Sequence, residues 1–147
     1  MNKFNINKAI GAGIAGTVVM TLFAMMAPLM GMPEMNIPKM LADFMGFPVV
    51  VGWLAHFMIG TILAVGYGSI LVSKLPGAPA VKGVLFGLIP WFMAQIVVNP
   101  MMGAGVFAMN TPAPLMMVMG SLVGHAVYGA VVGFVYGTTA QPKTATA

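Results

Sequence analysis

Four long runs of apolar residues, separated by short polar segments, restrict this chain more than any other feature of its sequence. The runs cover residues 9–30, 49–72, 83–102 and 115–137, and none of them contains Asp, Glu, Lys or Arg. A helix needs about 20 apolar residues to cross the hydrocarbon core of a bilayer. Each run is therefore predicted to form one transmembrane helix, and residues 1–147 to form a single membrane domain.

The scarcity of charged residues supports this prediction. Only 5% of the 147 residues are charged and 60% are hydrophobic, whereas a soluble domain carries about 25% charged residues. We therefore predict an all-α integral membrane four-helix bundle. The absence of cysteine excludes disulfides, thiolate metal sites and haem attachment through a Cys-x-x-Cys-His motif. The net charge of +4 comes from scattered lysines, which suit orientation in a lipid bilayer and do not indicate nucleic-acid binding.

The lysines also predict how the helices are oriented. Five of the six fall on one side of a four-span arrangement: Lys3, Lys8, Lys74, Lys82 and Lys143. Lys39 falls on the other side, together with both acids, Glu34 and Asp43. The positive-inside rule then places both termini in the cytoplasm, and segments 31–48 and 103–114 outside.

Capping and helix-breaking residues predict the ends of other helices. In segment 31–48, Asn36 can cap a short amphipathic helix on the membrane surface, which Gly46 then ends. In the third run, Asn99-Pro100 is expected to end the helix. Gln95 lies one turn before Asn99, and we expect both side chains to bond a neighbouring helix rather than to line a polar path.

The second and fourth runs carry the same residue pattern, 69 positions apart. The first copy reads Gly52-x₃-His56-x₃-Gly60-x₃-Ala64-x₂-Tyr67, and the second reads Ser121-x₃-His125-x₃-Gly129-x₃-Gly133-x₂-Tyr136. Steps of three and four place these positions on one face of each helix. We interpret the pattern as a duplicated hairpin with units at residues 9–72 and 83–137, which makes a parallel internal repeat. The two histidines are then expected to face each other at one depth.

Two symmetric imidazoles inside a membrane can hold a b-type haem. Haem iron takes axial imidazole ligands, and a flat macrocycle needs small residues beside those ligands. Small residues lie one turn on either side of the two histidines: Gly52, Gly60, Ser121 and Gly129. The pattern therefore predicts a haem-b site with His56 and His125 as iron ligands, serving electron transfer beside a larger membrane redox complex or a quinone. The chain has no arginine to pair with haem propionates, which counts against it.

Two other interpretations use the same residues. In one, the stripes are packing seams and each histidine bonds a backbone carbonyl or the opposing Tyr67 or Tyr136, as in a cofactor-free accessory or scaffold subunit. In the other, the 17 methionines supply thioethers for Cu(I) and the histidines receive the ion, although methionine is also a flexible apolar filler. No catalytic constellation is present, so we expect no independent enzymatic activity.

Three segments resemble a known family. They are Lys8-Ala-Ile-Gly-Ala-Gly-Ile-Ala-Gly-Thr-Val-Val-Met-Thr21, the methionine-rich segment 31–48, and Gly52-Trp-Leu-Ala-His-Phe-Met-Ile-Gly60. The chain resembles, over nearly its whole length, the small four-span bacterial membrane proteins that form a domain of unknown function. The resemblance implies a four-helix bundle in the bacterial inner membrane. It implies no catalytic residues, because the family carries no established activity.

Overall fold

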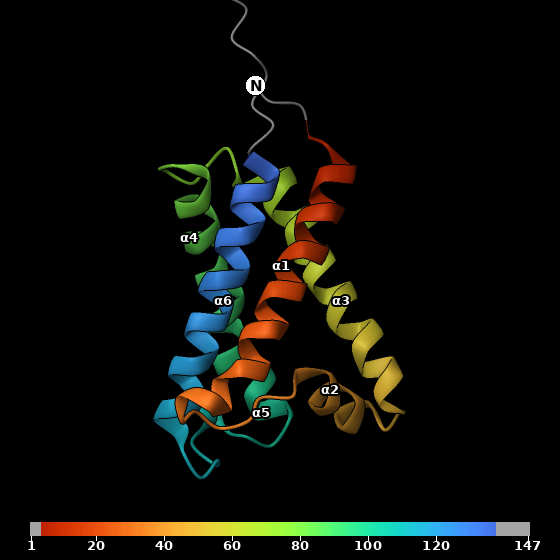
Figure 1. Ribbon diagram of the computed structural model, residues 1–147, viewed down its shortest axis with the longest axis vertical. Coiled ribbons are helices and arrows are strands. Elements are labelled where there is room, and N and C mark those ends of the chain that lie inside the picture. The colour runs from red at the N-terminus through yellow and green to blue at the C-terminus, as the bar shows by residue number, and fades with distance from the viewer. Residues whose placement is uncertain (1–3, 138–147) are drawn as a thin grey trace, which may run out of the picture.

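The computed structural model describes residues 4–137, and over this range it contains helices and no strands. Four helices in the described range are long and apolar enough to cross a membrane: Ile6–Met30, Val49–Leu71, Pro79–Met101 and Pro114–Gly137. The predicted all-α membrane bundle of four spans is confirmed (Figure 1). Lys3, Lys143 and the predicted polar tail 138–147 lie outside the described residues.

The first span begins with α1 (Ile6–Met26), three residues earlier than the apolar run predicts. The reason is a cap, because the side-chain oxygen of Asn5 accepts a hydrogen bond from the Lys8 backbone N–H at 3.1 Å. A 3₁₀ turn, Ala27–Met30, continues the span until Gly31, whose φ of 77° ends it. Lys8 therefore lies in the first turn of the helix rather than before it.

The predicted surface helix is α2 (Ile37–Met45), and its expected caps are both present. The Asn36 side chain accepts from the Lys39 backbone N–H at 3.1 Å, and Gly46 has a φ of 71°. The helix packs across the start of α3 (Val49–Gly66). The contact is close because the Pro38 carbonyl occupies the volume that a side chain on Gly52 would fill. The absence of a side chain at Gly52 therefore lets α2 pack closely against α3.

The third span starts four residues earlier than predicted. It begins with α4 (Pro79–Met93), and Pro79 suits the first helical turn because its missing N–H would have no partner there. Lys82 therefore lies inside the helix, and its Nζ donates to the Val72 carbonyl at 3.0 Å. That carbonyl follows the π-helical turn Tyr67–Leu71 that ends the second span, so a lysine caps this helix end.

The third span ends at Met101, one residue after Pro100 and one before the end of the predicted run at residue 102. A π-helical turn, Ala94–Val98, follows α4, and the short α5 (Asn99–Met101) carries the helix past Pro100. Proline is tolerated because it lies in the first turn of α5, after the regular hydrogen-bond ladder has already changed at the π turn. Gly103, with a φ of 82°, follows the actual end.

The remaining outer segment holds a 3₁₀ turn, Val106–Ala108, before α6 (Pro114–Gly137) completes the bundle. Helix α1 packs against both α3 and α6, and α4 packs against α6 (Figure 1). Helices α3 and α6 run in the same direction, toward the end of the bundle where the described chain begins and ends (Figure 1). We call this the terminal end, and the opposite one the α2 end.

Corresponding small residues form the seam of each hairpin. A methyl group on Gly13 of α1 would lie 2.7 Å from the Thr61 Cα and 3.0 Å from the Gly60 oxygen of α3. A methyl group on Gly83 of α4 would overlap the Gly129 carbonyl of α6 and lie 2.8 Å from the Gly133 nitrogen. The backbones of both hairpins therefore approach as closely as side-chain-free positions allow.

The two hairpins differ at the α2 end. Figure 1 shows α3 leaning away from α1 toward this end, where α2 lies beside it, whereas α4 and α6 stay together. A buried cluster of large side chains holds the terminal half of the bundle together: Tyr67, Phe86, Tyr128 and Val132, with Ala12 and Ala64. The first hairpin is therefore closed in the terminal half and opens toward the α2 end.

Candidate functional site

Two tyrosine bridges connect α3 and α6, the helices that carry the histidines. The Tyr128 hydroxyl donates to the Gly60 carbonyl at 2.5 Å, and the Tyr136 hydroxyl donates to the Gly68 carbonyl at 3.2 Å. Both histidines lie beside the same part of α1, because His56 bonds Thr21 and Gly124, next to His125, faces Met20.

His56 turns toward α1 rather than toward His125. Its Nε2 lies 3.0 Å from the Thr21 hydroxyl oxygen, and the ring is 7% exposed. The Thr21 hydroxyl donates its own hydrogen to the Thr17 carbonyl at 2.7 Å. The Thr21 oxygen must then accept, so we assign the proton to Nε2 of His56. The packing interpretation expects a backbone carbonyl or a tyrosine as the partner of this ring, but the partner is a threonine.

His125 bonds within its own helix, to one of the partner types that the packing interpretation expects. Its Nδ1 lies 2.8 Å from the Ser121 carbonyl oxygen, one turn earlier in α6, and 3.4 Å from the Ser121 hydroxyl. Because a carbonyl only accepts, Nδ1 carries the proton and Nε2 keeps its lone pair. This is the tautomer in which metal-bound histidines are usually held.

A chain of polar side chains connects His125 to α5. The Gln95 amide nitrogen donates to the Ser121 hydroxyl at 3.2 Å, and the Asn99 amide donates to the Gln95 oxygen at 3.0 Å. Gln95 is 1% exposed and lies in the π-helical turn. The Gln95 bond ties the third span to the fourth, as the helix-bonding interpretation predicts, whereas Asn99 bonds a side chain of its own span.

The four small residues beside the histidines are all in contact with neighbouring helices. Gly52 faces the Pro38 carbonyl of α2, and Gly60 faces the Thr17 hydroxyl of α1. Gly129 faces the Gly83 carbonyl of α4, and Ser121 bonds Gln95. A macrocycle beside either histidine would have to displace these helices.

Metal ligands of the usual kinds are not gathered in the described part of the chain. Residues 4–137 contain no group of three or more His, Asp and Glu side chains that could hold a metal ion. Several methionines instead fill space over glycines of α6. Met32 and Met35 lie over Gly120, and Met20 lies over Gly124. This is the filler role that flexible thioether side chains commonly take.

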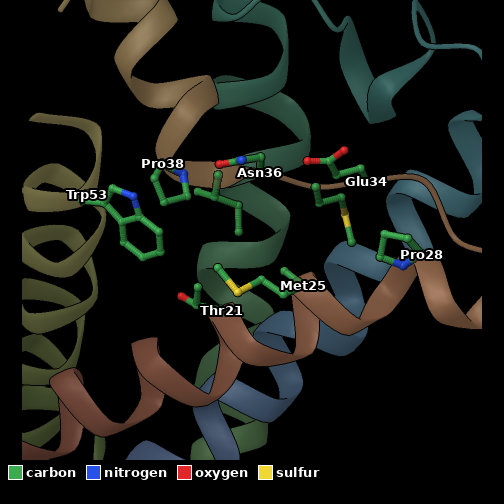
Figure 2. A pocket seen from close by; sticks show the side chains of 10 residues that line it. Thr21, Met25, Pro28, Glu34, Asn36, Pro38 and Trp53 are labelled. Atoms are coloured by element: carbon green, nitrogen blue, oxygen red, sulfur yellow. The ribbon is translucent and has the colours of Figure 1, made fainter. Parts of the chain in front are cut away.

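A pocket of about 240 Å³ lies where the first hairpin opens, between α1, the connecting segment, α2 and α3. Figure 2 shows Thr21 and Met25 on the α1 side, with Trp53 of α3 at one edge and Glu34 and Asn36 along the opposite side. Thr21 is also the residue that bonds His56, so the pocket and the first histidine share one side chain. Trp53 forms part of the wall.

Two residues of this arrangement escaped the sequence analysis. Thr21 bonds its own helix, as a threonine in an apolar helix commonly does, but it also holds His56. Tyr128 lies off the repeated stripe, and the position 69 residues before it is Ile59, so the repeat gives no signal for it. A tyrosine within an apolar span does indicate a hydroxyl that needs a partner, although not which one.

These features define a class of protein: a four-span integral membrane bundle of two hairpins, with polar side chains bonded across its helices and a pocket at one end. The chain belongs to the family of unknown function DUF6789, whose family model matches residues 4–147. The resemblance seen in the sequence is thereby confirmed. No curated protein and no solved structure matches the chain.

Proposed function

We propose that this protein is a cofactor-free accessory or scaffold subunit of a larger complex in the bacterial inner membrane. The observation that carries the proposal is the use of the small residues. Gly52, Gly60 and Gly129 each lie against an atom of a neighbouring helix that a side chain would overlap. The stripes therefore serve as packing seams, and the histidines serve as hydrogen-bonding groups between and within helices.

Haem-b binding with electron transfer is the second candidate, and the tautomer of His125 favours it. With Nδ1 bonded to the Ser121 carbonyl, Nε2 is free to act as a ligand. His56 fits less well, because its Nε2 is bonded to Thr21 and its ring turns toward α1. A haem bridging the two would require that bond to break and α1 to leave Gly60. These rearrangements place the haem hypothesis second.

Copper binding is the weaker alternative. Thioether sulfurs suit Cu(I), and methionines are abundant in both outer segments. The packing of Met32 and Met35 on Gly120 supports their role as apolar fillers instead. Metal analysis of the purified protein separates these two roles.

The membrane orientation belongs to the proposal as well. Among the described lysines, Lys8, Lys74 and Lys82 lie toward the terminal end, and Lys39 lies in α2 at the other. The positive-inside rule then directs the terminal end to the cytoplasm and the α2 end to the outside.

The test is the absorption spectrum of protein purified in mild detergent from haem-replete cells, together with metal analysis. We expect a colourless preparation without stoichiometric copper, which His125→Ala leaves spectrally unchanged. A Soret band that shifts on reduction and disappears in His125→Ala would establish the haem candidate instead.

The accessory role needs its own measurement. We expect the tagged protein in native membranes, solubilised gently, to migrate on native electrophoresis within an assembly much larger than itself. Migration only at its own size, both with and without prior cross-linking, would contradict a subunit role.

A further inference from the structure

We infer that the pocket at the α2 end binds a small organic cation, meaning an ammonium group carried on an apolar body. The inference goes beyond the packing role proposed above and does not depend on it. The pocket has a volume of about 240 Å³, is open on one side and is lined by residues from three separate segments of the chain. The opening of the first hairpin creates it, where α3 leans away from α1 (Figure 1).

The charge of the pocket selects against anions. Glu34 is the ionisable residue among those that line it. The nearby lysine, Lys39, does not neutralise this carboxylate, because its Nζ is paired with Asp43 at 2.6 Å. Within residues 4–137, Glu34 forms no salt bridge. Glu34 is exposed to solvent, so its negative charge lies at the open edge of the pocket, and no lining residue carries a positive charge.

The walls suit an ammonium group rather than a hydrated metal ion. Trp53 provides an indole ring, the aromatic side chain that attracts cations most strongly. Met25 and Met35 add polarizable thioethers, and the other lining side chains are largely apolar. Figure 2 shows Glu34 and Trp53 at opposite sides of the pocket, with Met25 on the α1 side. An alkylammonium ion can lie against the indole ring and the apolar side chains, with the Glu34 carboxylate attracting its charge from the opposite side of the pocket.

The floor of the pocket does not compete for hydrogen bonds. Thr21 donates to the Thr17 carbonyl and accepts from His56, so its hydroxyl is already satisfied. Thr21 therefore offers a ligand no free hydrogen-bond donor, and a quaternary ammonium needs none. A volume of about 240 Å³ limits the occupant to a small molecule.

The second hairpin shows why the pocket belongs to the first. Trp91 of α4 stands 70 residues after Thr21, the same offset that relates Gly13 to Gly83 in the two seams. The indole of Trp91 reaches α6, where its Nε1 donates to the Val118 carbonyl at 3.4 Å. In the second hairpin, the large Trp91 side chain thus contacts the fourth span. At the corresponding position of the first hairpin, the smaller Thr21 side chain leaves space for the pocket.

The experiment titrates phenyltrimethylammonium into the full-length protein in phosphatidylglycerol nanodiscs. Calorimetry measures binding, and fluorescence reports on Trp53 in a Trp91→Phe background. The matched probe is tert-butylbenzene, which has the same shape without the charge. We expect saturable binding of the cation, with a change in Trp53 emission, and at least about fivefold weaker binding of the neutral compound.

Glu34→Gln should weaken cation binding by about fivefold. The control is the double variant Lys39→Gln/Asp43→Asn, which removes the ion pair outside the pocket without freeing the lysine and should leave binding unchanged. Trp53→Leu, followed by calorimetry, should weaken binding by about three- to tenfold, and it provides a second variant if Glu34→Gln does not fold. Equal effects of Glu34→Gln and the Lys39→Gln/Asp43→Asn control, equal binding of the two probes, or no saturable binding would each overturn the inference.

The ammonium group can come from the aqueous phase or from a lipid headgroup, and a further arm distinguishes the two. Replacing half of the phosphatidylglycerol by phosphatidylethanolamine introduces competing headgroups. A fall in apparent affinity that is absent in Glu34→Gln identifies the lipid as the occupant. An unchanged affinity identifies a free organic cation.

Discussion

At the scale of single residues, glycines set the distance between the helices of this bundle, because they have no side chain at the points of contact. Gly83 and Gly129 face each other across the α4–α6 seam, and each lies against the carbonyl oxygen of the other. Without a hydrophobic driving force between helices in lipid, such close approach supplies the dispersion contacts that hold a membrane bundle together. Replacing one of these glycines by alanine should therefore test whether the close approach stabilises the bundle.

Gly83→Ala is expected to destabilise the protein by about 1–3 kcal/mol, because its methyl group would overlap the Gly129 carbonyl and force the helices apart. The matched control is Gly11→Ala in α1, where a methyl group meets no atom within 4 Å. Thermal unfolding in detergent, followed by circular dichroism, measures both. The control should be neutral or slightly stabilising, since alanine has the higher helix propensity, and equal behaviour of the two variants would contradict this account.

Replacement by phenylalanine is expected to change the stability in different ways at two buried tyrosines. Tyr128→Phe removes the hydrogen bond to the Gly60 carbonyl and should cost about 0.5–1.5 kcal/mol of stability. Tyr67 is fully buried, and its hydroxyl has no hydrogen-bond partner among residues 4–137. Tyr67→Phe should therefore be neutral or stabilising. The same unfolding measurement compares them, and a larger loss for Tyr67→Phe would show that its hydroxyl does have a partner.

At the scale of elements, α2 is held on the bundle by its contact with the start of α3. The Pro38 carbonyl lies over Gly52, and the Lys39–Asp43 ion pair on the outer side is exposed and contributes little. The contact between the Pro38 carbonyl and Gly52 is therefore the one that holds α2 against α3.

Gly52→Ala should release α2 and make it sensitive to trypsin after Lys39, the lysine at this end of the bundle. A local destabilisation of about 1.4 kcal/mol would raise the cleavage rate about tenfold. Mass spectrometry of the fragments over time measures the rate, with Gly11→Ala as the control. Unchanged cleavage in Gly52→Ala would mean that other contacts dock α2.

The ends of the elements show what local sequence can and cannot predict. Asn36 and Gly46 fixed both ends of α2, because capping depends on a side chain and its nearest backbone neighbours. The apolar run missed the start of α4, because Lys82 is polar and yet helical. Its ammonium group reaches the Val72 carbonyl on the preceding span, a partner that no window of local sequence contains.

At the scale of the whole molecule, the orientation in the membrane is the main expectation still to be measured. Asn110→Cys at the α2 end and Ser73→Cys in the turn before α4 can each be introduced into a chain without cysteine. In intact cells we expect a membrane-impermeant maleimide to label Asn110→Cys but not Ser73→Cys, since the lysines direct the terminal end inward. Labelling of both should require permeabilised cells, and the reverse pattern in intact cells would invert the topology.

The fold class, the number of spans and the spacing of the repeated stripe could all be predicted from the order of residues, because hydropathy and helical periodicity depend on nothing else. Periodicity says which residues share a helix face, but not which helix covers that face. Only the tertiary structure decided that Thr21 of α1 holds His56, that neighbouring helices fill the space beside the glycines, and that α3 diverges to leave a pocket.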